Sequence, residues 1–163
     1  MIQSVRSHTG PAALIKLAQD VLNTEIAGLA AVRDRLNART PEKAPLVLAL
    51  GLLAACTGRV VVTGIGKSGL VGRKLAATFS STGTPAFFLH PVEGAHGDLG
   101  SLRKDDVIIA ISNSGETAEL NAILPALKSL GTSLIAMTGR EDSTLGRLAD
   151  VTLHSGVPRE ACP

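Results

Sequence analysis

Tryptophan and tyrosine are absent from this sequence, and only three phenylalanines occur among its 163 residues. A core built around large aromatic side chains is therefore excluded. Apolar residues nevertheless make up 45% of the chain, which is enough for a hydrophobic core at this length. The sequence predicts one domain with an aliphatic core.

Three further scarcities exclude whole classes of protein. Cys56 and Cys162 are the only cysteines, and their spacing fits neither a disulfide framework nor a metal site. A net charge of +2 gives no bulk attraction to nucleic acid. Gly51 and residues 57–59 interrupt the longest apolar run before it reaches membrane-spanning length. The cysteine usage indicates a reducing cytoplasm, and no secretory signal pattern precedes the first expected helix. We therefore expect a cytoplasmic protein, and the charge and the apolar runs predict neither nucleic-acid nor membrane partners.

Two helices are expected before the first strand. Apolar residues recur every three or four positions over residues 11–38, which predicts a long amphipathic helix. Its apolar face is expected to pack either on another subunit or on the chain's own sheet. Residues 1–10 are expected to be a flexible N-terminus. A second helix is expected over residues 40–57, because Thr-Pro favours a helix start and a glycine follows the end.

From residue 59 onward, short apolar runs alternate with helical patterns. This alternation predicts an α/β fold: a three-layer, doubly wound parallel sheet flanked by helices. Five strands are predicted, at residues 59–62, 85–89, 106–112, 133–137 and 151–153. Ser114 is expected to cap a helix over residues 116–130, and Ser143 to cap a short helix. Residues 90–100 are expected to form a loop.

Residues 59–72, RVVVTGIGKSGLVG, join the first strand to its helix through a glycine-rich turn. Glycines let backbone N–H groups approach a ligand, and the new helix directs its positive end there. Lys67 adds a cation and Ser68 a hydroxyl donor. The spacing is not that of a P-loop. No acidic residue follows about 20 residues later, as a dinucleotide-binding turn requires. Anion binding and plain helix–strand packing both remain consistent with this turn.

A second polar stretch, SNSGET at residues 112–117, follows the third predicted strand. Ligands of open α/β sheets bind at the carboxyl ends of the strands. Capping the following helix would need only one hydroxyl, and this stretch carries three in six residues. Together with the helix N–H groups, these hydroxyls could form an uncharged cradle for a phosphate.

Four stretches, VVTGIGKSG, STGTPAFFLHPVEGAHGDLG, IAISNSGET and EACP, resemble the sugar isomerase (SIS) domain. Within that family they are similar to the D-arabinose-5-phosphate isomerases, over residues 11–163. The resemblance implies interconversion of D-ribulose 5-phosphate and D-arabinose 5-phosphate through an enediol, which feeds the synthesis of Kdo for lipopolysaccharide. It also implies no cofactor, a small-molecule sugar phosphate as ligand, and a homo-oligomer expected to be a tetramer.

The same resemblance assigns site residues. The substrate phosphate is expected to be held by Ser68, Ser112, Ser114 and Thr117. The catalytic positions are expected to be Lys67, Glu119, Glu160 and His96, with His96 lining the site of its own or of a neighbouring subunit. The chemistry requires such groups independently, since moving a proton between C1 and C2 needs a carboxylate base. A cation such as Lys67 would stabilise the enediolate oxygen.

Each of these residues also has a plainer interpretation. Glu119 would then be a surface acid, Glu160 a charge on the tail, Lys67 a solvated loop lysine and His96 a residue that fixes its loop. A metal site is a further alternative, formed by His90, Glu93, His96 and Asp98. Because these side chains lack regular ligand spacing, no metal is predicted.

In full-length relatives, the resemblance implies that the chain continues past EACP into a helix, a catalytic histidine and usually two CBS domains. We therefore expect these 163 residues to bind substrate but to turn it over poorly.

Two rival functions follow from the same sequence. A sugar-phosphate sensor, the SIS part of a transcriptional regulator, would have no use for Lys67, Glu119 and Glu160 together. A purely structural subunit would not need the three hydroxyls of SNSGET.

Overall fold

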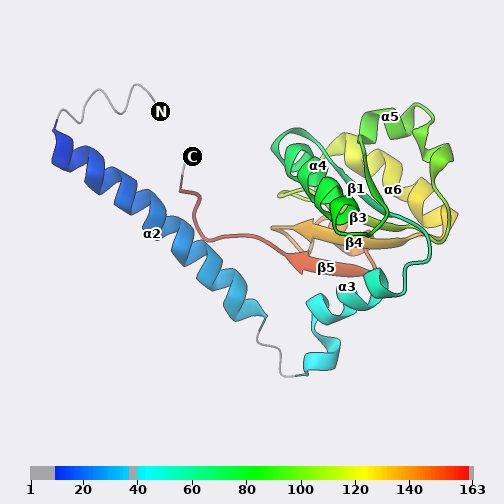
Figure 1. Cartoon of the computed structure of the whole chain (residues 1–163), viewed down its shortest axis with the longest axis horizontal. Coiled ribbons are helices and arrows are strands. Elements are labelled where there is room, and N and C mark those ends of the chain that lie inside the picture. Colours follow the sequence, from blue (N-terminus) through cyan, green and yellow to red (C-terminus); the bar gives the residue numbers. More distant parts are fainter. Residues whose placement is uncertain (1–9, 37–39, 162–163) are drawn as a thin grey trace. The chain divides into compact units, whose positions relative to one another are not determined.

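The computed structural model describes residues 10–36 and 40–161. The chain divides into two compact units, Met1–Asn37 with Val157–Pro163 and Ala38–Gly156, and each is described by itself. Figure 1 shows the elements of both, coloured along the sequence. No helix within the described ranges is long and apolar enough to cross a membrane.

The larger unit is built on one parallel sheet. Its strands are β1 (Val60–Gly64), β2 (Ala86–Leu89), β3 (Val107–Ile111), β4 (Ser133–Thr138) and β5 (Val151–His154). They lie in the order β2-β1-β3-β4-β5, and every neighbouring pair is parallel. This order confirms the predicted doubly wound α/β fold, and all five predicted strands are present within a residue or two of their expected limits.

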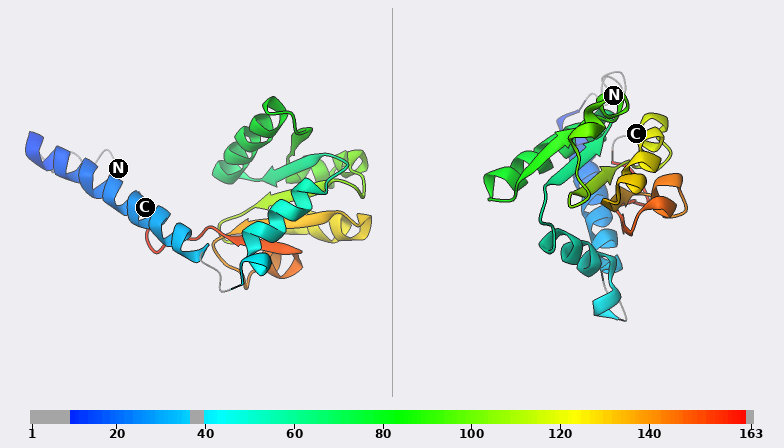
Figure 2. Two further views of the ribbon diagram at one scale, coloured as in Figure 1. Left: turned by 60° about the horizontal axis from the view of Figure 1, so that its bottom comes forward. Right: turned by 90° about the vertical axis from the view of Figure 1, so that its right-hand side faces the viewer.

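Helices cover both faces of the sheet, as the end-on view in Figure 2 (right) shows. On one face, α3 (Pro45–Ala54) and α4 (Gly66–Ser81) pack against Val60, Val62 and Ile109. On the other face, α6 (Ala118–Leu130) and α7 (Thr144–Leu148) pack against Val61, Ile108 and Leu134. Consecutive residues of β1 and β3 thus enter opposite cores, because side chains alternate along a strand. This explains why both strands read as uninterrupted apolar runs.

A buried carboxylate joins the starts of β1 and β3. Asp106, 1% exposed, accepts hydrogen bonds from the backbone N–H groups of Arg59 (2.8 Å) and Arg103 (2.9 Å). It also accepts one from the Arg59 guanidinium at 3.2 Å. Burial alone would raise the pKa of this carboxyl, but the two backbone hydrogen bonds and the Arg59 guanidinium outweigh it, so the pKa lies below its usual value. The charged carboxylate therefore fixes the register that pairs Val60 with Val107.

Two predicted elements differ from the observed ones. The helix expected over residues 40–57 is broken into a 3-10 turn, η1 (Pro41–Lys43), and α3, because Ala44 precedes a proline and adopts an extended conformation. The loop expected over residues 90–100 contains α5 (Pro91–Ala95) and a 3-10 turn, η2 (Asp98–Ser101). The side chain of His90 caps α5 by accepting from the Val92 N–H at 3.3 Å. Histidine is not among the preferred capping residues, so the proline at the first helical position, Pro91, was the main local signal of this helix.

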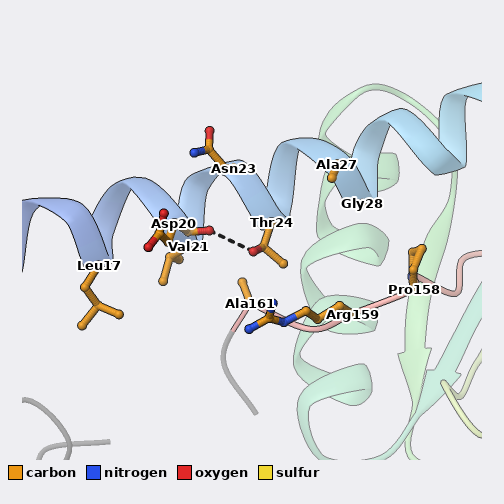
Figure 3. Close-up of a pocket in the computed structure, with 10 residues that line it drawn as sticks. All are labelled: Leu17, Asp20, Val21, Asn23, Thr24, Ala27, Gly28, Pro158, Arg159 and Ala161. Atoms are coloured by element: carbon orange, nitrogen blue, oxygen red, sulfur yellow. Dashed lines mark hydrogen bonds between the residues drawn. The ribbon is translucent and has the colours of Figure 1, made fainter.

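The smaller unit contains α2 (Pro11–Arg35), which agrees with the predicted long helix as far as Arg35. Positions 37 and 38 of that prediction, and positions 1–9 of the predicted flexible N-terminus, lie outside the described residues. One stripe of α2 faces the C-terminal segment of the same unit. A Cβ on Gly28 would lie 3.1 Å from Val157 Cγ1, so the absence of a side chain permits this contact. Leu17, Asp20, Thr24 and Arg159 contribute to a cavity of about 500 Å³ between helix and segment (Figure 3).

Candidate active site

The two turns that the sequence predicts as the site follow β1 and β3. β1 and β3 are central neighbours, but α4 leaves β1 toward one face of the sheet and α6 leaves β3 toward the other. Such a switch point opens a crevice at the carboxyl ends of the two strands. Gly64 pairs with Ile111 at those ends, so the turns that follow β1 and β3 start side by side.

The first of these turns leads directly into α4. A Cβ on Gly64 would lie 2.9 Å from the Ile111 carbonyl oxygen, and one on Gly69 would lie 2.8 Å from the Gly64 carbonyl oxygen. Both glycines are therefore required by close packing, whatever the turn binds. Ile65 is the N-cap of α4 and provides no side-chain hydrogen bond. Lys67 and Ser68 occupy the first turn of the helix, with Lys67 exposed and Ser68 half-buried.

The second turn, which we call the hydroxyl loop, is residues 112–117. Ser112 is buried, and its Oγ accepts from the Gly115 N–H at 3.1 Å and lies 2.9 Å from Thr117 Oγ1. Only one hydroxyl hydrogen is used within the Ser112–Thr117 pair, so the pair keeps one O–H that could be donated to a ligand. Ser114 is exposed and accepts from the Glu116 N–H at 3.2 Å.

The prediction that Ser114 caps the helix after β3 is wrong. The N-cap of α6 is Thr117, whose side chain makes no capping hydrogen bond because it is paired with Ser112 instead. Neither α4 nor α6 therefore has a side-chain cap, and the first N–H groups of both helices are directed toward the crevice end of the sheet. Two helix N-termini without caps are a favourable environment for an anion.

The hydroxyl loop is fixed from outside by the segment that joins β4 to α7 and by the first turn of α7. The Gly139 N–H donates to the Asn113 carbonyl at 2.9 Å, and the Leu145 N–H donates to the Gly115 carbonyl at 3.1 Å. Gly115 has a φ of 65°, and a Cβ placed on it would lie 1.9 Å from Ser143 Oγ. Only glycine fits this position, both in conformation and in space. The loop is thus held in shape by neighbouring elements.

Glu116 is a functional candidate that the sequence reasoning missed. Its Oε1 accepts from the Thr144 N–H at 2.8 Å, at the first residue of α7. Hydrogen bonds from Thr144 lower the pKa of the Glu116 carboxyl, and the charges of Arg147 and Arg140 lower it further. Its partner is 28 residues away, so only the known order of β3 and β4 could have suggested the contact.

The remaining predicted residues are placed less completely. Glu119 is the second residue of α6 and is exposed, and His96 is the exposed C-cap of α5. Glu160 is exposed and belongs to the smaller unit, so it is not placed relative to the hydroxyl loop. Within the part of the chain that the structure describes, no three His, Cys, Asp or Glu side chains are grouped so that they could hold a metal ion.

The sheet order and the hydroxyl loop define a class of protein. The family model of the SIS domain matches residues 53–162, and the chain belongs to this family. Its similarity extends to individual curated isomerases. It is 52% identical to arabinose 5-phosphate isomerase KdsD of Salmonella typhi over 145 residues, which is 89% of this chain and 42% of that protein.

Two further comparisons agree with this. The chain is 57% identical to KdsD of Pseudomonas aeruginosa over 117 residues, 72% of this chain and 36% of that protein. A solved structure of an Escherichia coli CFT073 protein in complex with arabinose 5-phosphate superposes with a TM-score of 0.81 at 44% identity, covering 94% of this chain and 78% of the other. The resemblance to arabinose 5-phosphate isomerases is confirmed. The chain spans about two-fifths of the length of the curated Salmonella typhi relative.

Proposed function

We propose that this chain is the sugar-phosphate domain of an arabinose 5-phosphate isomerase. It interconverts D-arabinose 5-phosphate and D-ribulose 5-phosphate without a cofactor, in the cytoplasm, and its product feeds Kdo and lipopolysaccharide synthesis. The observation that carries the proposal is the hydroxyl loop at the β1/β3 switch point, beside a helix that begins without a side-chain cap. The 44% identity to a protein solved with arabinose 5-phosphate supports the choice of ligand.

The substrate phosphate is assigned to the crevice between the two turns. Ser112, Ser114 and Thr117 supply hydroxyl groups from the hydroxyl loop, and Ser68 supplies one from the first turn of α4. The N-terminal N–H groups of α4 and α6 add partial positive charge that favours a dianion. Gly64 and Ile111 pair at the base of the crevice, which supports a single phosphate position shared by both turns.

The isomerisation needs one proton moved between adjacent carbons. A carboxylate, Glu119 or Glu160, takes the proton from C2 of arabinose 5-phosphate, the C–H electrons form the C1–C2 double bond, and the C1 oxygen gains a proton. Returning a proton to C1 while the C2 oxygen loses one gives ribulose 5-phosphate. Lys67 stabilises the negative oxygen of the enediolate. His96 lines the site, either in its own subunit or in a neighbouring one.

Solvent exchange at carbon tests this proposal even where turnover is slow. Arabinose 5-phosphate incubated with the chain in D₂O is expected to lose its C2 proton signal, since abstraction by a carboxylate is followed by exchange. Lys67→Met is expected to slow the exchange with a smaller change in ligand affinity, because the enediolate forms only after binding. The matched control is Lys74→Met, an exposed lysine two turns further along α4. Proton NMR records the exchange and calorimetry the binding.

Three outcomes are distinct. Exchange that depends on Lys67 but not on Lys74 supports the isomerase. Binding of arabinose 5-phosphate without any exchange would favour a sugar-phosphate sensor. If the chain neither binds nor exchanges the sugar phosphate, the proposed function is wrong.

Assembly is a second part of the proposal. A stripe on α2, which we call the α2 seam, carries apolar side chains that are 52–72% exposed: Ile15, Leu22, Ile26, Leu29 and Leu36. They recur at spacings of seven or of four and three residues, the pattern of a coiled-coil seam. The opposite stripe of α2 already faces the C-terminal segment of the same unit. The seam therefore fits a second copy of the chain, in a dimer or a tetramer of dihedral symmetry.

Placing charge on the α2 seam is expected to separate the subunits. The double variant Leu22→Glu with Leu29→Glu would bury two carboxylates in the interface, which costs far more than leaving them in water. The matched control adds the same charges at exposed positions beside the seam, Ala12→Glu with Asn23→Glu. Light scattering at micromolar concentration is expected to show an oligomer for the wild type and the control, and a smaller species for the seam variant. A monomeric wild type would contradict this assignment.

A further inference from the structure

The helices that follow β1, β3 and β4 begin near the carboxyl edge of the sheet, and they differ in how their first N–H groups are used. α4 and α6 have no side-chain cap. At α7 two side chains serve as acceptors: Ser143 Oγ accepts from the Gly146 N–H at 3.2 Å, and Glu116 Oε1 accepts from the Thr144 N–H at 2.8 Å. The N-terminus of α7 is thus satisfied by the protein itself, while those of α4 and α6 have no such side-chain acceptor.

Glu116 differs from an ordinary capping residue because it belongs to another element. Its backbone is part of the hydroxyl loop, where its N–H donates to Ser114 Oγ at 3.2 Å. Its carboxylate contacts two other elements. Oε1 accepts a hydrogen bond from the Thr144 N–H of α7, and Oε2 lies 3.5 Å from Asn121 Nδ2 of α6. One side chain therefore connects the hydroxyl loop, α6 and α7.

We infer that Glu116 is a positioning residue, which holds the hydroxyl loop in its phosphate-binding shape by accepting a hydrogen bond from the Thr144 N–H. The inference rests on the proposed sugar-phosphate function of the loop.

The hydrogen bond of Glu116 lies beside the tight packing of Gly115 against the start of α7. The Gly115 carbonyl accepts a hydrogen bond from the Leu145 N–H, and the Gly115 α-carbon lies so close to Ser143 that no side chain would fit between them. These contacts form only while the loop lies against the start of α7. The directions of the Ser112 and Thr117 hydroxyl groups, which pair with each other, depend on the same loop conformation. A loop that opened part of the time would bind phosphate more weakly, because its affinity scales with the fraction of time that it is closed.

The experiment compares three variants of the chain by amide hydrogen exchange and by ligand titration. Glu116→Ala removes both acceptor oxygens, Glu116→Gln keeps the acceptor Oε1, and Glu141→Gln alters an exposed glutamate in the neighbouring turn as the matched control. In Glu116→Ala, the Thr144 and Leu145 amides are expected to exchange about 3- to 30-fold faster, the range for a lost N-cap hydrogen bond. The apparent Kd values for inorganic phosphate and for arabinose 5-phosphate are expected to rise by up to the same factor. Glu116→Gln should recover most of both effects.

Kinetic and binding measurements distinguish a role of Glu116 in positioning the loop from a role in the stability of the fold alone. In a turnover assay, Glu116→Ala is expected to raise KM with little change in kcat, since only phosphate anchoring is loosened. Faster exchange with unchanged affinity would overturn the inference, and so would unchanged exchange. If the wild type binds neither ligand, the proposed function fails. The exchange comparison would still decide whether Glu116 holds the loop.

Discussion

The double variant Ser112→Ala with Ser114→Ala is expected to bind arabinose 5-phosphate at least 100-fold more weakly than the wild type. Hydrogen bonds to charged groups are each worth about 1.5–3 kcal/mol, so losing two corresponds to roughly 10²- to 10⁴-fold in affinity. Ser112 contributes twice, because its Oγ also accepts from the Gly115 N–H and orients the Thr117 hydroxyl. Calorimetric titration of the sugar phosphate measures the effect.

The single variants divide this loss between direct contact and loop shape. Ser114 is exposed and holds only the Glu116 N–H, so Ser114→Ala should weaken binding without disturbing the loop. Ser112 is buried, so Ser112→Ala should also accelerate amide exchange at Gly115. Ser129→Ala, on the exposed side of α6, is the matched control. Unchanged affinity in the double variant would remove the hydroxyl loop from the phosphate site.

The sheet was predictable because its signals are local. Each strand is a short apolar run, and the uniform apolar character of residues 107–111 correctly indicated burial on both faces. The hydroxyl loop was also found, since polar residues directly after a buried strand fall at a known edge of the sheet. The function of the glycine turn was not decided by sequence. Gly64 and Gly69 are explained by close backbone packing alone, so only Lys67 and Ser68 still point to a ligand there.

The errors come from side-chain hydrogen bonds that residue type alone does not reveal, two of them local and one between distant segments. Ser114 looked like a helix cap, but Ser112 engages Thr117 and shifts the helix start to residue 118. Glu116 looked like an ordinary first-turn acid, because its partner at Thr144 is brought close only by the pairing of β3 with β4. His90 caps α5 although histidine is an uncommon cap. Glu160 remains a prediction, since it lies in a unit whose placement is separate from the site.

Removing the Asp106 carboxylate is expected to cost roughly 2–5 kcal/mol of unfolding free energy, because two backbone N–H groups, of Arg59 and Arg103, lose their acceptor in a buried place. The Arg59 guanidinium is partly exposed and also donates to the Ser101 carbonyl, so its charge is not stranded. The effect should reach the far end of the strands. Asp106 fixes Val60 opposite Val107, and the same register places Gly64 opposite Ile111 under the crevice that we propose for the phosphate.

The pH dependence identifies the carboxylate as the cause. Since the pKa of Asp106 is lower in the folded chain than its ordinary value of 3.8, its stabilisation is complete above that value and is lost as the pH falls through the folded pKa. Urea unfolding of the wild type and of Asp106→Ala, followed by circular dichroism because the chain has no tryptophan or tyrosine, should therefore give curves that differ most near neutral pH and converge in acid. Asp105→Ala, at the exposed neighbouring position, should stay close to the wild type throughout. A stability difference that stayed constant down to about pH 2 would mean that Asp106 acts through its shape and its neutral hydrogen bonds, and not through its charge.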